Sequence, residues 1–246
     1  MGILVLTLGG FLAAFVDTGL GMGYGMILVP LLLLSGSRPF EAASLTLVSQ
    51  LVVGTLGTIF HFKHKNISQE DLKKLYLAAV PAVIMATLGA LANISLPPEY
   101  TVLYMAFIML TLGTLLALGI KVRVGKSAFT LLSAIAGFNK GFTGTGFGPI
   151  IVSGGVFYDN NVKSSVAVGT LSGLLVSLFG SIPYLASFHF STEKLLLLTP
   201  FTILGSIIGP RFTKYFGSSP IASRIVGLFV ILVTVIIFFE VIAWGS

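Results

Sequence analysis

The sequence predicts an all-α integral membrane protein with two inverted-topology repeats, each a broken-helix hairpin followed by three transmembrane helices. Of its 246 residues, 55% are hydrophobic and only 9% are charged, whereas a soluble globular domain carries about 25% charged residues. Several uncharged runs exceed the roughly 20 residues that a helix needs to cross a bilayer. A glycine-rich motif interrupts an apolar segment in each half of the chain, which indicates two related halves.

The first repeat is expected to occupy residues 1–122. No Lys or Arg precedes its first apolar stretch and no cleavage site follows it, so a removable signal peptide is not expected. Helices are favoured over barrel strands, because the runs are long and evenly apolar and lipid offers the backbone no hydrogen-bond partners. The first short segment ends at the motif DTGLGMGYG. The expected helices cover residues 3–16, 26–35, 41–62, 71–94 and 100–120.

The second repeat, residues 123–246, follows the same order of short and long segments. Its first short segment breaks at NKGFTGTGFG. When residues 15–30 are laid over residues 138–153, six of the sixteen positions are identical, and three of these are glycines in the pattern GxGxG. The match indicates an internal duplication, and a chance match between two glycine-rich apolar stretches is the alternative. The expected helices cover residues 127–138, 149–158, 164–187, 193–212 and 222–244, in one compact unit with the first repeat.

The distribution of Lys and Arg predicts the orientation of these segments. If each short pair is a hairpin that enters and leaves on one side, eleven of these residues lie on one face and two on the other. If each pair is one interrupted crossing, the counts are eight and five. The positive-inside rule favours the hairpins. Three crossings per half then invert the second repeat, and both termini are expected on the non-cytoplasmic side of a plasma or inner membrane.

Several classes of function lack their motifs in this sequence. The absence of Cys excludes disulfides and thiolate sites, and the three His residues form only a weak metal signal, so no cofactor or metal is expected. No HExxH, GxSxG or paired-carboxylate arrangement supports an enzyme, and no GxxxxGK[ST] motif supports ATP binding. The net charge of +6 reports membrane orientation rather than nucleic-acid binding. Inverted repeats with broken helices are typical of secondary transporters, whose site lies near the bilayer midplane.

The two glycine motifs carry the expected chemistry. Glycine weakens a helix interior by about 1 kcal/mol but permits a positive φ and a close backbone approach. Where a helix restarts after a break, its free N–H groups and positive dipole end favour an anion. Unwound carbonyl groups can instead hold cations, so geometry alone leaves the sign of the solute open. Close packing of small residues is the structural alternative, but GxGxG does not place the glycines on one helix face.

Asp17 and Lys140 are the ionisable residues expected at membrane depth, where such groups are costly and are functional candidates. They occupy equivalent positions at an offset of 123 residues, so a pseudo-two-fold axis would bring them together. A structural ion pair is one interpretation. In the other, Lys140 binds the solute, while Asp17 couples transport to protons or positions Lys140.

The remaining candidates are glycines of the breaks and small polar residues beside them. Ser and Thr in membrane helices often bond only their own backbone or a neighbouring helix, which is the alternative for each hydroxyl. The residues expected to bind the solute are Gly21, Gly23, Tyr24, Gly25, Thr46, Gln50, Asn139, Lys140, Thr143, Gly144, Thr145, Gly146, Phe147, Gly148 and Thr170.

The paired motifs FLAAFVDTGLGMGYGMILVPLLLLSG and GFNKGFTGTGFGPIIV, with the AASLT and AVGTL segments that follow, resemble the TauE/SafE family of membrane permeases over essentially the whole chain. The resemblance implies a transporter of sulfite, sulfoacetate or another small organosulfur anion, with lipid and a small anion as partners and protons as a candidate coupling ion. Tyr24 and Phe147 stand where the family commonly has smaller residues, and Lys140 is not a general family feature. A permease for a cation or divalent metal, coordinated by Asp17 and broken-helix carbonyls, is the alternative. The oligomeric state stays open.

Overall fold

The computed structural model describes residues 2–119, 125–159, 162–187, 191–216 and 220–244, and this part of the chain is helical without any strand. The all-α prediction is therefore confirmed. The elements in chain order are α1 (Gly2–Leu20), α2 (Tyr24–Leu34), α3 (Pro39–Lys63), η1 (Gln69–Asp71), α4 (Leu72–Ser95), α5 (Pro98–Leu118), α6 (Lys126–Thr143), α7 (Phe147–Asp159), α8 (Val162–Ala186), α9 (Thr192–Phe216) and α10 (Pro220–Trp244). The expected boundary between the halves, at residues 122 and 123, lies outside the described residues.

Five helices within the described residues are long and apolar enough to cross a membrane. These spans are Pro39–Lys63, Leu72–Ser95, Pro98–Leu118, Val162–Ala186 and Thr192–Thr213. Large apolar side chains such as Ile84, Phe107 and Leu228 point away from the protein interior, as lipid rather than water requires. These features confirm the prediction of a multi-pass membrane protein. The sixth expected crossing corresponds to α10. Its described apolar stretch, Arg224–Ile236, is shorter than the five spans.

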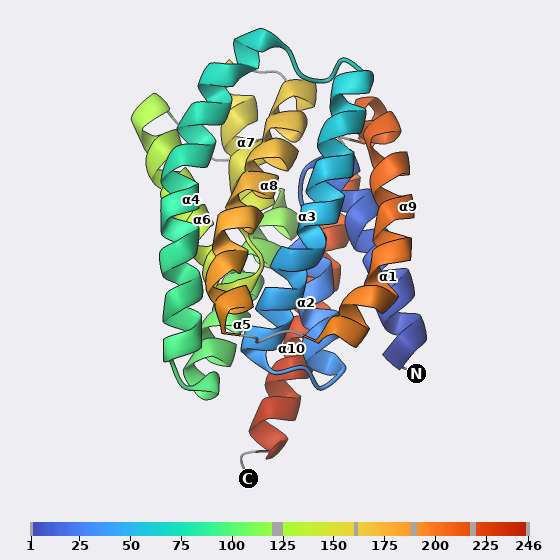
Figure 1. Ribbon diagram of the computed structural model, residues 1–246, viewed down its shortest axis with the longest axis vertical. Coiled ribbons are helices and arrows are strands. Elements are labelled where there is room, and N and C mark those ends of the chain that lie inside the picture. Colours follow the sequence, from blue (N-terminus) through green and yellow to red (C-terminus); the bar gives the residue numbers. More distant parts are fainter. Residues whose placement is uncertain (1, 120–124, 160–161, 188–190, 217–219, 245–246) are drawn as a thin grey trace.

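The helices enter from two opposite ends of the molecule. In Figure 1, α1 rises from the lower end into the interior and α2 returns to the lower end, while α6 and α7 approach the interior from the upper end. The lower end is where α2 is followed by α3 and α8 by α9; the upper end is where α3 is followed by α4 and α7 by α8. Both α1 and α10 have their outer ends at the lower end of the view.

Both broken helices are longer than the sequence predicts. The expected ends at residues 16 and 138 are wrong, because α1 continues to Leu20 and α6 to Thr143. The backbone bonds from Gly21 N–H to the Asp17 carbonyl (2.6 Å) and from Gly144 N–H to the Lys140 carbonyl (2.8 Å) extend the helical pattern past both charged residues. A charge in an apolar run does not stop a helix, since its backbone can still bond.

The restarted helices also begin earlier than expected. The starts predicted at residues 26 and 149 are wrong, because α2 begins at Tyr24 and α7 at Phe147. Pro149 is therefore the third residue of α7 rather than its first. The first turn of a helix has no intrahelical partner for its N–H groups, so a proline costs little at any of these positions.

Glycines allow each broken helix to lie directly against a full-length helix. A methyl group on Gly209 of α9 would lie 2.7 Å from the Phe15 carbonyl oxygen of α1, and one on Gly89 of α4 would overlap the Phe138 carbonyl oxygen of α6. Phe15 and Phe138 are equivalent at the offset of 123 residues. Small residues at such contacts let membrane helices approach closely. The long helices α9 and α4 thus hold α1 and α6 in corresponding ways.

Candidate solute-binding site

The two glycine motifs form two short non-helical breaks in the protein interior. Each break consists of three residues, because α1 ends at Leu20 before α2 starts at Tyr24, and α6 ends at Thr143 before α7 starts at Phe147. The first and third residues of each break have positive φ: Gly21 (72°), Gly23 (118°), Gly144 (76°) and Gly146 (90°). Side chains disfavour this conformation, so the alternating glycines are required by the turn itself.

The last glycine of each motif lies against the backbone of the opposite break. A methyl group on Gly25 would overlap the carbonyl oxygen of Gly144, and one on Gly148 would lie 2.6 Å from the carbonyl oxygen of Gly21. The two contacts correspond to each other, because Gly148 is 123 positions after Gly25 and Gly144 is 123 positions after Gly21. The breaks therefore cross with their main chains in contact.

A cavity of ≈ 20 Å³ lies at this crossing. About 10–15 Å³ is enough for one water molecule, so the space at the crossing holds a water molecule and little more. Twelve of the cavity-lining residues were singled out from the sequence: Asp17, Gly21, Gly23, Tyr24, Gly25, Gln50, Lys140, Gly144, Thr145, Gly146, Phe147 and Gly148. Four others were not: Met26, Pro149, Gly169 and Gly173. Gly169 and Gly173 lie one turn apart on α8, within the small-residue segment AVGTLSG.

A glutamine side chain connects the two buried charges. The Lys140 ammonium donates to Gln50 Oε1 (2.5 Å), and Gln50 Nε2 donates to Asp17 Oδ2 (3.1 Å). Asp17 Oδ1 also accepts the backbone N–H of Tyr24 at 3.3 Å. Lys140 is 4% exposed and Asp17 is 6% exposed. Buried charges need a compensating partner, and the amide of Gln50, with its donor and acceptor, serves both.

The absence of a side chain at Gly173 leaves room for this connection. Gly173 is the counterpart of Gln50 at the offset of 123 residues. A methyl group on Gly173 would lie 3.8 Å from Lys140 Nζ and 3.9 Å from Gln50 Nε2, and a longer side chain would enter their space. The Lys140 ammonium also lies 5.6 Å from the centre of the Phe147 ring, within the range of a cation–π interaction. The site is thus asymmetric in chemistry although its backbone contacts are paired.

Thr145, a residue of the cavity wall, carries a buried hydroxyl without a hydrogen-bond partner among the described residues. Its side chain is 2% exposed. Its backbone N–H donates to Thr143 Oγ1 at 3.0 Å, which orders the break. A buried hydroxyl without a partner costs about 1–3 kcal/mol, which a bound solute would recover.

Four residues singled out from the sequence do not line the cavity. The hydroxyls of Thr46, Thr143 and Thr170 donate to the carbonyl groups four residues earlier in their own helices. Asn139 faces α5, where its Oδ1 accepts the Tyr104 hydroxyl at 2.5 Å. In this closed arrangement these side chains support the helices around the site, as the structural alternative for small polar residues predicts.

The segments that form the two breaks lie in the part of the chain that matches a known protein family. A family model described as "Sulfite exporter TauE/SafE" matches residues 6–237, which include both breaks. The chain is 28% identical over 152 residues to the probable membrane transporter protein YtnM of Bacillus subtilis (strain 168), covering 57% of this chain and 50% of that protein. The chain thus spans about half the length of the curated relative it matches, and no solved structure matches it. Because the family match covers nearly the whole chain, the resemblance noted in the motifs is confirmed, and the chain belongs to the sulfite exporter TauE/SafE family.

Proposed function

We propose that the chain is a secondary transporter of a small anion and that the crossing of the two breaks is its binding site. The observation that carries this proposal is that one cavity wall contains both the buried Lys140 and Thr145, whose hydroxyl has no hydrogen-bond partner among the described residues. The cavity also meets the first residues of α2 and α7. Free N–H groups and the positive dipole ends of these helices add to the attraction for an anion.

A sulfur oxyanion fits the donors at this site. Sulfite and sulfonate groups present several oxygen acceptors, which match an ammonium, a hydroxyl and backbone N–H groups that approach from different elements. The family description, which names sulfite export, supports the same choice. Sulfite, sulfoacetate and related sulfonates are therefore the solutes proposed. The positive charge of Lys140 disfavours a cation or divalent metal held by Asp17. The described residues also contain no cluster of three or more metal-ligating side chains.

Binding of such an anion requires the closed site to rearrange. A cavity of ≈ 20 Å³ holds a water molecule but not sulfite or a sulfonate. In the closed state Gln50 Oε1 occupies a hydrogen-bonding position on Lys140 that a solute oxygen would need. The anion therefore displaces the Gln50 carbonyl from Lys140, and the surrounding helices separate to admit it.

The paired contacts support two inverted repeats, residues 1–122 and 123–246. The Gly25–Gly144 and Gly148–Gly21 contacts are related by the offset of 123 residues. Two halves that enter from opposite ends and meet at a central site are typical of transporters that open to each side in turn. The charge distribution supports an orientation in which the upper end faces the cytoplasm and both termini lie on the opposite side.

The proposal is tested by uptake into proteoliposomes. Labelled sulfite, sulfoacetate and taurine are compared with divalent cations, with and without a pH gradient, against protein-free liposomes. We expect at least one of these anions to accumulate and the cations not to do so. Movement of a cation without any anion would overturn the proposal and favour the cation permease.

Replacing Asp17 by Asn is expected to remove any effect of the pH gradient while anion exchange continues. Asn keeps the size of Asp17 and one acceptor oxygen, so it can accept one of the two hydrogen bonds from Gln50 and Tyr24, and it cannot gain or lose a proton. In the parent protein, protonation of Asp17 weakens the hydrogen bond that it accepts from Gln50. Gln50 can then move away from Lys140, which becomes available to the anion. The measurement is uptake at equal and unequal pH in the two proteins. A pH-gradient effect of parent size in Asp17→Asn would show that Asp17 only positions Lys140.

A further inference from the structure

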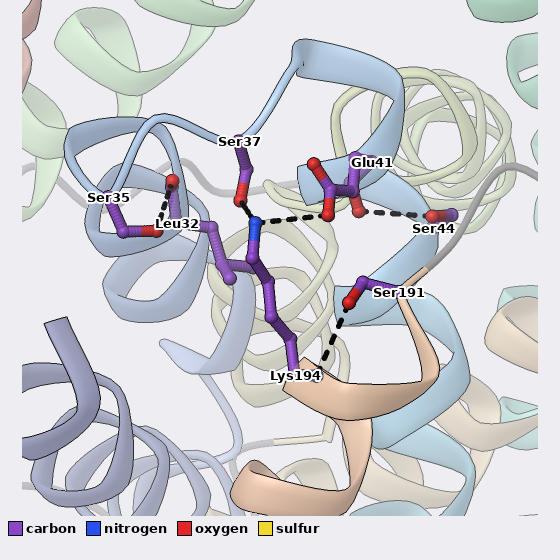
Figure 2. A network of polar contacts seen from close by, with 7 residues as sticks. All are labelled: Leu32, Ser35, Ser37, Glu41, Ser44, Ser191 and Lys194. Carbon is purple, nitrogen blue, oxygen red and sulfur yellow. Dashed lines mark hydrogen bonds and ion pairs between the residues drawn. The ribbon is translucent and has the colours of Figure 1, made fainter.

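Two lysine-centred clusters join the halves of the chain, one at each end of the molecule. In the lower lysine cluster, the Lys194 ammonium of α9 donates to Ser37 Oγ at 2.7 Å and to Glu41 Oε1 at 3.0 Å (Figure 2). Ser37 precedes α3 and Glu41 lies in its first turn. The cluster therefore ties the start of α9 to the start of α3.

The upper lysine cluster makes the corresponding connection between α4 and α8. The Lys74 ammonium donates to Ser165 Oγ at 2.7 Å and to Ser164 Oγ at 3.2 Å. The Ser164 hydroxyl in turn donates to Asp71, the last residue of η1. Burial raises the pKa of the Asp71 carboxyl, but hydrogen bonds from Ser164 and Ser68 and the charge of Lys74 outweigh it, so its pKa lies below the ordinary value. The group is therefore a carboxylate at neutral pH.

The two clusters occupy equivalent positions in the fold. Lys74 and Lys194 are each the third residue of their helices, α4 and α9. Their partners Ser164 and Glu41 are each the third residue of α8 and α3. Lysines thus join the start of α9 to the start of α3 and the start of α4 to the start of α8, and these two pairs of helix starts lie at opposite ends of the molecule (Figure 1).

One helix of each connected pair also reaches the cavity, α3 through Gln50 and α8 through Gly169 and Gly173. Gln50 lies nine residues beyond Glu41 on α3, and Gly173 lies nine residues beyond Ser164 on α8, which is about 14 Å at the rise of an α-helix. Neither cluster touches the cavity, which lies between them. Both clusters are formed in this structure, and the cavity between them has a volume of only ≈ 20 Å³.

We propose that the lower and upper lysine clusters are the two gates of the transport path, and that each breaks while the other stays formed. This inference rests on the proposed function, because a transporter has to expose its site to one side at a time. Separating Lys194 from Glu41 frees the first turn of α3 from α9 and opens the site at the lower end. Separating Lys74 from Ser164 and Ser165 frees α8 from α4 and opens it at the upper end.

The two gates differ in their exposure. The side chains of Lys194 and Glu41 are 26% and 21% exposed, so water can replace their contact. Lys74 is 2% exposed. Removing its side chain would take the ammonium group away from the buried hydroxyls of Ser164 and Ser165 and from the Asp71 carboxylate. Exposed ion pairs stabilise weakly, whereas breaking a buried charged contact is costly. The lower gate therefore opens more readily than the upper gate in the absence of solute.

Single-cysteine labelling tests the gates directly, because the chain has no cysteine of its own. Met26→Cys places a thiol in the cavity wall. Its reaction with a membrane-impermeant maleimide is measured in right-side-out and inside-out membrane vesicles. Lys194→Ala is expected to raise the labelling rate from the lower-end side alone, and Lys74→Ala from the upper-end side alone. The rise should be about tenfold or more for the buried Lys74, which loses a charged hydrogen bond, and about twofold to fivefold for the more exposed Lys194.

The controls separate a gate from a general loss of structure. Arg38→Ala and Lys73→Ala remove exposed positive charges beside each cluster and should leave labelling unchanged. The exchanged pair Lys194→Glu with Glu41→Lys should restore the parent rate, and Ser165→Ala provides a milder upper-gate variant. A rise from both sides in each variant, or no rise beyond the controls, would overturn the gates. Labelling needs no solute, so a failure of the gates is distinguished from a failure of anion uptake.

Discussion

Lys140→Ala is expected to lower the affinity for the transported anion by about 100-fold, since the substitution removes a charged hydrogen-bond donor in a low-dielectric site. Lys140 lines the cavity, and its ammonium bonds Gln50. The affinity is measured with the purified protein by isothermal titration with sulfite and with sulfoacetate, and by the concentration dependence of uptake. Lys126→Ala is the matched control, because Lys126 is exposed at the start of the same helix.

The same substitution leaves Asp17 without its compensating charge, so a loss of binding needs to be separated from a loss of folding. The double variant Lys140→Ala with Asp17→Asn removes both charges. The amide side chain at position 17 can still form a hydrogen bond with the Gln50 amide. We expect it to elute as the parent protein does in size-exclusion chromatography but to bind no anion. Parent-like affinity in the double variant would exclude Lys140 from the binding site.

Gly25→Ala and Gly148→Ala are expected to destabilise the protein to a similar extent, because each methyl group meets the backbone of the opposite break. Overpacking costs about 1–3 kcal/mol, and backbone atoms held in a tight turn cannot move aside as a side chain does. For a chain of this size the apparent melting temperature should fall by about 3–10 °C. The measurement is thermal unfolding of the purified protein in detergent, followed by its anion uptake after reconstitution.

Gly125→Ala is the control for both glycine substitutions. A methyl group there meets nothing within 4 Å, and its φ of −78° suits any residue. It should therefore melt at the parent temperature. If Gly25→Ala melts with the control while Gly148→Ala does not, the two breaks do not hold each other in corresponding ways, and the paired crossing is wrong.

Much of the architecture follows from the sequence, because bilayer crossing depends on local composition. The long apolar runs correspond to helices, and the two GxGxG motifs mark both breaks, since alternating glycines weaken a helix wherever they occur. Asp17 and Lys140 are conspicuous because a charge in an apolar segment is costly whatever its neighbours. Their equivalent positions in the two motifs also predict their proximity, which the shared contact with Gln50 provides.

Other features depend on which face of each helix meets a neighbour, and only the tertiary structure decides this. Thr46 and Thr145 have the same hydroxyl group, but the first bonds its own helix, and the second belongs to the cavity wall and has no partner among the described residues. Gln50 bonds Lys140 beside Gly173 of α8, a neighbour 123 positions from Gln50 that only the tertiary packing brings close.

The two lysine clusters also depend on tertiary packing rather than on local sequence. Lys74 is one of several basic residues at its helix end and is not distinguished in sequence from the exposed Lys73 beside it. Its burial against Ser164 and Ser165 arises from the packing of α4 against α8. The sequence by itself determined the helical membrane fold, the two breaks and the two buried charges, because local composition sets the cost of each. The tertiary structure decided which polar groups share the cavity and which close its ends, because those contacts join residues about 90–160 positions apart.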